Sequence, residues 1–136
     1  MNHKDIVKHF YEVVVSENLF HEIPQYIAKD YMQKIGENEI FIGVEGMQQH
    51  LMAVKTIYPD YAMKIGRQFE DGDTVISEFV MSGTLSGEFM GITPTNKVIK
   101  ITGVDISKVV DGKIVEHGGA ANTFEAFWEN GLIKPV

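Results

Sequence analysis

Four polar residues near the C-terminal end of the chain have the chemistry to bind and process a small molecule. Asp105 and Ser107 lie in one apolar run, and Glu116 and Asn122 lie in or just after the next. A carboxylate whose pKa burial raises toward neutrality can take a proton beside a carbonyl, and an amide can donate a hydrogen bond to the enolate that forms. We therefore treat Asp105 or Glu116 as the candidate base and Asn122 as the candidate donor.

A hairpin must bring these residues together. Asp111-Gly112 is a two-residue turn signal, so residues 104–109 should pair antiparallel with residues 114–120. The pairs predicted for this turn are Ser107 with Glu116, Asp105 with Gly118 and Ile101 with Asn122. One sheet face would then carry all four polar residues and form the floor of a pocket.

The carboxylates also have structural interpretations. Asp105 could bond to the backbone or to a neighbouring strand, and Glu116 could make only a cross-strand contact. Glu78 follows a second turn signal, Asp71-Gly72, and lies either in the pocket or exposed beside Arg67 or Lys64. The pairs predicted in this second hairpin are Ile65 with Glu78 and Met63 with Val80.

The N-terminal half of the chain has helical periodicity. Asn2 can cap a helix with Asp5 at its third position. This first helix would have an apolar stripe of Ile6, Phe10, Val13 and Val14. A second helix is predicted over 19–28, followed by a strand over 31–35 and a loop over 36–43. A third helix follows this loop and ends at Pro59-Asp60. Tyr11, Tyr26 and Tyr31 could each offer a hydroxyl to a ligand or belong to the core.

Helices followed by antiparallel strands predict an α+β fold, with the helices on one face of a sheet. Glycines inside the strand patterns permit bulges and sharp bending, so the sheet could wrap the helices and leave a cone-shaped cavity. A short closing helix is expected over residues 123–130, where Gly131 would stop it.

Composition limits the functional classes. The 136 residues, 44% of them hydrophobic, predict a single domain over 1–136. A net charge of -7 argues against nucleic acid or an anionic membrane as partner, and no apolar run is long enough to span a membrane. The chain contains no cysteine, which fits a reducing compartment, and we expect a cytoplasmic protein.

The histidines give no metal-binding pattern. His3, His9, His21 and His50 lack a chelating spacing such as i, i+4, and His117 should point to the opposite sheet face from Glu116. We therefore expect no metal site and no cofactor, and we interpret His117 as structural.

Several short motifs occur along the chain, and their order and spacing are more informative than any one of them. They are GVEG at 43–46, YPD at 58–60, EDGD at 70–73, GT at 83–84, GEFMGITPTNK at 87–97 and DGKIVEH at 111–117. In this combination the chain resembles the SnoaL-like polyketide cyclases and predicted ester cyclases, within the nuclear transport factor 2-like superfamily. The resemblance implies a cystatin-like curved sheet wrapped by three helices, frequent dimerisation, and a deep apolar pocket that closes rings by aldol chemistry without a cofactor.

Some family positions carry other residues in this sequence. The acid/base aspartate of the family corresponds to Asn122, and a preceding tryptophan corresponds to Gly118. Two histidines of the pattern are replaced by Leu85 and Lys34. The resemblance thus adds Lys34, Leu85 and Gly118 to Glu78 and Tyr31, the other candidates for substrate binding.

Three functional hypotheses follow. The first is a cyclase, isomerase or hydrolase acting on a small apolar or aromatic carbonyl compound, and the second is a protein that binds such a compound without chemistry. The third is a structural or regulatory module that forms a homodimer through the outer sheet face, which would carry Val104, Ile106 and Val115.

Overall fold

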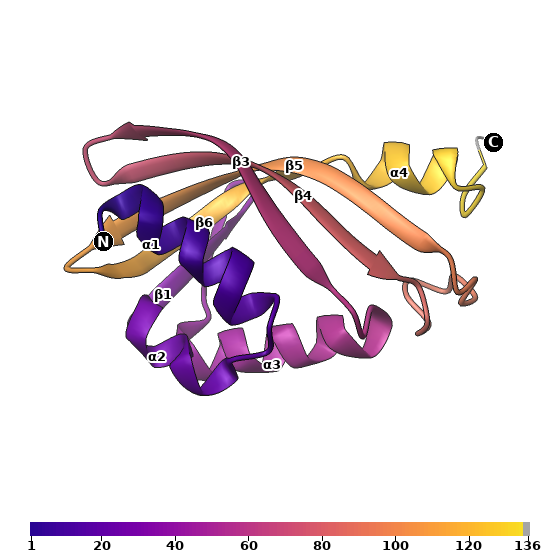
Figure 1. Cartoon of the computed structure of the whole chain (residues 1–136), viewed down its shortest axis with the longest axis horizontal. Coiled ribbons are helices and arrows are strands. Elements are labelled where there is room, and N and C mark those ends of the chain that lie inside the picture. Colours follow the sequence, from indigo (N-terminus) through magenta and orange to yellow (C-terminus); the bar gives the residue numbers. More distant parts are fainter. Residues whose placement is uncertain (135–136) are drawn as a thin grey trace.

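A curled sheet of six strands covers a group of helices without closing into a barrel (Figure 1). The computed structural model describes residues 1–134, so the last two residues of the expected domain lie outside the described part. The strand order is β2-β1-β6-β5-β4-β3, in which β1 and β6 are parallel and the other neighbours are antiparallel. The predicted α+β class, with helices on one face of a curved sheet, is confirmed.

The first helical segment changes geometry along its length. Helix α1 (His3–His9) begins at the predicted capping box, where the side chains of Asn2 and Asp5 each accept from the other's backbone N–H. The chain then continues as a π-helix, η1 (Phe10–Val15), which is a rare geometry often found at functional sites. The π-helix buries Phe10, Tyr11, Val14 and Val15.

The predicted second helix over 19–28 is wrong in its extent. A 3-10 turn, η2 (Phe20–Glu22), leads into a single helical turn, α2 (Ile23–Tyr26), which has Pro24 near its start. The chain then enters β1 (Ile27–Ile35), where Ile27 pairs with Ile114 of the distant β6. The predicted loop over 36–43 contains a further strand, β2 (Asn38–Phe41), which forms a hairpin with β1.

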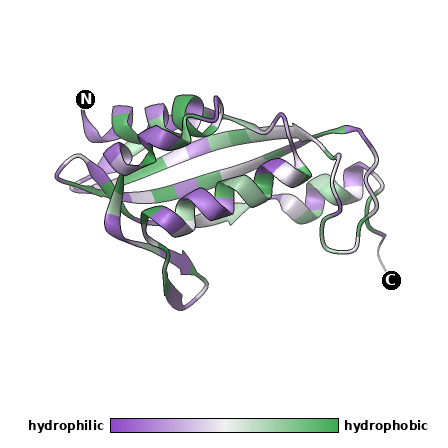
Figure 2. Ribbon diagram, turned by 90° about the horizontal axis from the view of Figure 1, so that it is seen from below, coloured by the Kyte–Doolittle hydropathy of each residue, from purple (hydrophilic) through white to green (hydrophobic). Residues whose placement is uncertain are grey.

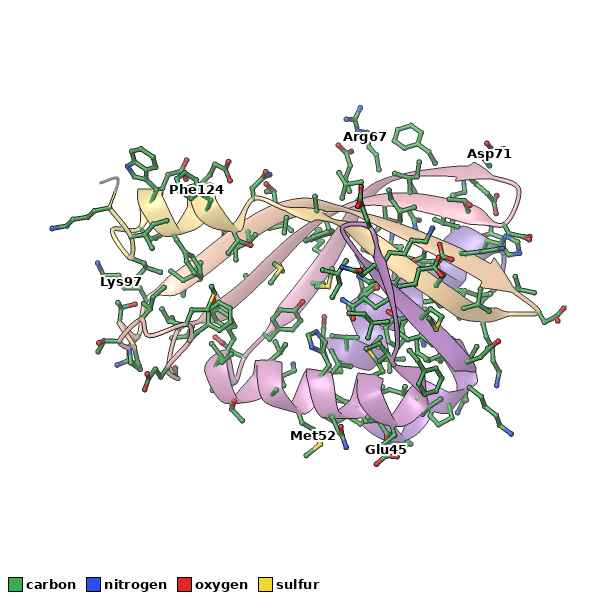
Figure 3. The ribbon with its side chains drawn as sticks, turned by 180° about the vertical axis from the view of Figure 1, so that it is seen from behind. Glu45, Met52, Arg67, Asp71, Lys97 and Phe124 are labelled. Carbon is green, nitrogen blue, oxygen red and sulfur yellow. The ribbon has the colours of Figure 1, made fainter. Side chains whose placement is uncertain are left out.

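Helix α3 (Gly43–Ile57) lies beneath the sheet (Figure 1). Met47 and Leu51 are buried on the side of the helix that faces the sheet, whereas Glu45 and Met52 point away from it (Figure 3). Hydrophobic and hydrophilic residues accordingly alternate along this helix (Figure 2). The helix and the sheet thus enclose the apolar interior.

Strands β3 (Ala62–Asp71) and β4 (Thr74–Thr84) form the second predicted hairpin, but in a different register. Asp71 pairs with Thr74, and the register shifts again between Ile65 and Gln68. The predicted pairs are therefore wrong, since the observed pairs are Ile65 with Phe79 and Met63 with Met81. The Glu12 side chain of η1 bonds to β3, an edge strand of the sheet, where it accepts a hydrogen bond from the Ile65 backbone N–H at 2.8 Å.

Strands β5 (Val98–Val110) and β6 (Lys113–Ala121) turn at Asp111-Gly112 as predicted, with both residues at positive φ. Val109 pairs with Ile114, but Lys108 pairs with Glu116, so Val115 is an extra residue in β6. Beyond this bulge the predicted register is wrong by one residue. The observed pairs are Ser107 with His117 and Asp105 with Gly119.

The C-terminal helix α4 (Thr123–Glu129) follows β6 and lies beside β5 (Figure 1). It ends before Gly131, which has a φ of 72°, as the sequence predicts. Phe127 is buried, whereas Phe124 and Trp128 are exposed. No helix within residues 1–134 is long and apolar enough to cross a membrane.

Candidate active site

A cavity of about 340 Å³ lies between the inner face of the sheet and α3. Most of its wall is apolar or aromatic, and its polar groups lie on η1, β1, α3, β5, β6 and α4 and in the segment between α3 and β3. The lining residues are Tyr11, Val15, Tyr31, Gln33, Met47, His50, Leu51, Val54, Ile57, Tyr58, Tyr61, Met63, Phe79, Met81, Phe89, Ile101, Asp105, His117, Thr123 and Phe127. A mostly apolar wall with a few convergent polar groups is typical of a small-molecule site.

Asp105 lies at the centre of a cluster of polar side chains. Its side chain is 1% exposed and accepts a hydrogen bond from the Ser107 hydroxyl at 2.7 Å. The other carboxylate oxygen contacts Nδ1 of His117, and the Tyr11 hydroxyl lies 3.3 Å from the same oxygen and 3.1 Å from that nitrogen. A buried carboxylate is tolerated only when such donors replace water.

The tyrosines around this carboxylate remain protonated. Burial and the negative charge of Asp105 hold the pKa of Tyr11 well above its usual range. The same two causes raise the pKa of Tyr31, which is 1% exposed and lines the cavity from β1. Both phenols can therefore act as hydrogen-bond donors at neutral pH.

The imidazole of His117 lies between two hollows. It lines the main cavity and also a shallow groove of about 270 Å³ that passes over residues 118–121. Gln33 and Phe79 line both hollows as well. Nδ1 of the ring lies against Asp105 and the Tyr11 hydroxyl, and no described residue forms a hydrogen bond with Nε2.

His50 adds a second imidazole to the cavity wall from α3. Partial burial lowers its pKa, and the positive charge that His117 can carry lowers it further. Among residues 1–134 no group of three His, Cys, Asp or Glu side chains is arranged to hold a metal ion.

The bulge separates the residues that the sequence placed together. Asp105 lies in the cavity wall, whereas Glu116 faces outward and pairs with Lys34 at 3.3 Å. Asn122 is exposed, and its side-chain amide donates to the Thr102 hydroxyl at 2.7 Å, on the outer face as well. The prediction that the two carboxylates and Asn122 share one face is therefore wrong.

The structure also places the predicted binding residues. Tyr31 lines the cavity, but Lys34 and Gly118 line the shallow groove instead. Leu85 is fully buried in the core outside the cavity wall. Glu78 is 40% exposed on the outer face and pairs with Arg67, which is the surface alternative considered above.

The sequence does not place His117 at the site, and it leaves Tyr11 open between a ligand-binding hydroxyl and a core residue. A one-residue shift exchanges the two faces of a strand, so the bulge at Val115 turns His117 inward and Glu116 outward. Tyr11 is buried on η1, and its side chain lines the cavity. The one available signal was the pair of glycines after His117, which is typical of an irregular strand.

Comparisons with known proteins agree with this architecture. The family model of the SnoaL-like polyketide cyclases matches residues 5–129, and a search of curated proteins gave no match. Among solved structures, IdmH of Streptomyces antibioticus, a candidate polyketide cyclase, is 24% identical with a TM-score of 0.82, covering 96% of this chain and 99% of its own.

Two further solved structures are similar. A candidate polyketide cyclase from Acidithiobacillus ferrooxidans is 19% identical with a TM-score of 0.83, and the match covers 98% of this chain and 97% of that one. AclR of Streptomyces galilaeus, a candidate hydroxylase, is 22% identical with a TM-score of 0.82, and the match covers 98% of this chain and 83% of AclR. At these identities the structures show a shared fold and leave the reaction open.

Proposed function

The chain belongs to the SnoaL-like polyketide cyclase family, and on this premise we propose that it is a cofactor-independent acid/base enzyme acting on a small apolar carbonyl compound. The observation that carries the proposal is the buried contact between Asp105 and His117 in the wall of an apolar cavity. A carboxylate, an imidazole and a phenol that meet in an apolar cavity are suited to moving a proton at carbon.

The roles follow from the contacts. Nε2 of His117 takes a proton from the carbon beside the carbonyl, while Asp105 accepts a hydrogen bond from Nδ1 and stabilises the imidazolium that forms. Tyr31 donates to the enolate oxygen. Tyr11 is a positioning residue, since its hydroxyl lies against both Asp105 and His117. In a cyclase the enolate carbon then attacks a second carbonyl, and the imidazolium returns its proton to the alkoxide that forms; in an isomerase the imidazolium returns the proton to another carbon.

Proton abstraction can be tested without the natural substrate. The probe is 4-phenylcyclohexanone in D₂O, whose protons beside the carbonyl exchange for deuterium when a base forms the enolate. We expect the protein to accelerate this exchange, and His117→Gln to lower the protein-dependent rate by about 10²–10⁴-fold. Proton NMR follows the loss of the exchanging signals.

The matched control is Glu116→Gln, which changes the neighbouring side chain on the outer face. It should leave the exchange rate unchanged. An equal loss of exchange rate in both variants, or a wild-type exchange rate in His117→Gln, would contradict the assignment of His117 as the base. Binding of the probe with no exchange would favour the alternative, a small-molecule binding protein.

We also propose a cytoplasmic homodimer that pairs through the outer sheet face. Val104 and Ile106 on β5 are 39% and 45% exposed, and the apolar side chains of Ile76 and Val80 are exposed on the adjacent β4. The Glu78–Arg67 pair lies among these side chains, and the exposed apolar residues on either side of it support pairing with a second copy. A monomer at micromolar concentration in sedimentation would rule this dimer out.

A further inference from the structure

The side chain of Gln33 is a polar group in the cavity wall that the protein itself leaves unpaired. It lies half-buried on β1 and lines both the main cavity and the shallow groove. No hydrogen bond joins its amide to a described residue, and neither amide atom is fully buried. An amide has two donor hydrogens and an acceptor oxygen, so this side chain is available to a ligand in either sense.

Gln33 lies directly beside the proposed base. It is the ladder partner of His117 in the parallel pair of β1 and β6, and neighbouring strands are about 4.8 Å apart. Tyr31 comes two residues earlier on β1, so its side chain points to the same face of the strand. All three side chains line the cavity. The amide of Gln33 is therefore a neighbour of both the imidazole and the phenol.

The chemistry of enolate formation requires a donor close to the base. The oxygen of a ketone is only two bonds away from the carbon that loses its proton. Negative charge grows on this oxygen as the proton leaves, and a preorganised donor in an apolar site stabilises that charge. An amide does not ionise, so Gln33 can donate at any pH at which His117 can act as a base.

The charges around the cavity also favour a neutral donor. No lysine or arginine is among the described residues that line it. Lys34, which follows Gln33 on β1, lies outside the cavity lining and pairs with Glu39 and Glu116. Burial lowers the pKa of His50, so this second imidazole is mainly uncharged at neutral pH. An enolate in this cavity would therefore depend on hydrogen bonds from amide and hydroxyl groups.

We infer that the side-chain amide of Gln33 donates a hydrogen bond to the reacting carbonyl oxygen and, together with Tyr31, stabilises the enolate. This inference rests on the proposed function, because it takes His117 as the base. As the C–H bond breaks, its proton passes to Nε2 of His117 and its electron pair forms the carbon–carbon double bond of the enolate. The π electrons of the carbonyl move onto the oxygen, which accepts the hydrogen bond from the amide.

A ketone labelled with ¹³C at its carbonyl carbon tests this hydrogen bond directly. The probe is 4-phenylcyclohexanone with the protein at saturating concentration, because donation to a carbonyl oxygen moves the NMR signal of the carbon to higher frequency. We expect the signal bound to Gln33→Leu to move back toward that of the probe in an apolar solvent. Deuterium exchange of the same probe should slow by about 10²-fold.

Three further variants separate donation from structural effects. Gln33→Glu keeps the size of the side chain but replaces the donor by a carboxylate, so it should also lose the signal shift and the fast exchange. Met32→Leu changes the preceding residue of β1, which is half-buried but does not line the cavity, and should preserve both. His117→Gln should lose the exchange and preserve the signal shift, because it leaves Gln33 and Tyr31 in place.

The carbonyl signal and the exchange rate have separate consequences. An unchanged signal in both Gln33 variants would overturn the inference even if exchange slows, since Gln33 would then act only on the position of His117. An unchanged exchange rate in both variants would overturn it as well. Neither result contradicts the proposed function, which His117→Gln tests. If the wild-type protein neither binds the probe nor exchanges its protons, the proposed function fails and the inference fails with it.

Discussion

Two carboxylates with side-chain partners lie on opposite faces of the same part of the sheet. On the inner face Asp105 contacts His117, and on the outer face Glu78 accepts two hydrogen bonds from the guanidinium of Arg67, one of them at 3.0 Å. Ser77, the residue before Glu78, pairs with Asp105 across the ladder. The two carboxylates are therefore neighbours in the sheet that differ mainly in their surroundings.

The two pairs differ in solvent exposure, and only the buried pair has the surroundings typical of a functional site. Glu78 is 40% exposed and Arg67 is 77% exposed, so water and salt screen their attraction. Asp105 is 1% exposed and has given up its hydration for protein donors. A protein gains little stability from such a buried charge relative to an apolar residue, so its presence in a cavity wall points to chemistry.

The largest effect on stability should come from Asp105→Ala. The change leaves the buried Ser107 hydroxyl without its acceptor and leaves Tyr11 only Nδ1 of His117 as a partner, at about 1–3 kcal/mol for each group. We expect the free energy of unfolding to fall by roughly 2–6 kcal/mol in urea titrations. Ser107→Ala, which removes one donor and leaves Asp105 its other partners, should cost less. Equal stability of Asp105→Ala and wild type would mean that the pair is no more important than a surface contact.

An intermediate effect is expected from Gly119→Ala. Gly119 pairs with Asp105, has a φ of 141°, and would place a Cβ against the carbonyl oxygen of Val104. Alanine must therefore either strain the backbone or shift β6, at a cost of about 1–3 kcal/mol. Urea unfolding measures the loss, and the His117 ring signals in NMR report any change of register.

The control for this prediction is Ala120→Ser, at the next and also exposed position of β6. It should leave both the stability and the His117 signals as in the wild type. Unchanged stability of Gly119→Ala would show that the backbone at this position does not hold the register.

The smallest effect should come from Glu78→Gln on the outer face. Its bonds to Arg67 lower the pKa of Glu78 below the ordinary value of 4.5. The stabilisation is therefore fully present above that value and is lost as the pH falls through the lower, folded-state pKa. We expect the Tm of the variant to stay close to that of the wild type at pH 7, and the small difference to vanish in acid.

One result would contradict the distinction between the buried pair and the exposed pair. A drop in Tm for Glu78→Gln as large as that for Asp105→Ala would show that exposure does not distinguish the two pairs. Differential scanning calorimetry between pH 3 and pH 7 gives both quantities. High salt should reduce the Glu78 contribution and leave that of Asp105 almost unchanged.

Much of the fold follows from local sequence. The capping box at Asn2, the turn at Asp111-Gly112 and the end of α4 before Gly131 were predicted and are present. In each case neighbouring residues fix the backbone. The alternation along β5 likewise predicted that Asp105 and Ser107 share a face, and both are buried.

The missed elements depend on distant partners. The early start of β1 requires Ile27 to pair with Ile114, and β2 exists only because β1 offers it an edge. The second helix was predicted too long because its last residues gain more from this pairing than from helical periodicity. Tertiary contacts overrode local propensity at each of these places.

The sequence by itself determined the class of fold, the turns that join the strands, and a polar cluster in an otherwise apolar wall. Tertiary structure alone decided which members of that cluster meet. One extra residue at Val115 reverses every side chain that follows it, so His117 reaches Asp105 while Glu116 and Asn122 face outward. The turn fixes only the pairs nearest to it, whereas the register beyond the bulge depends on contacts with η1, β1 and the Val104 carbonyl.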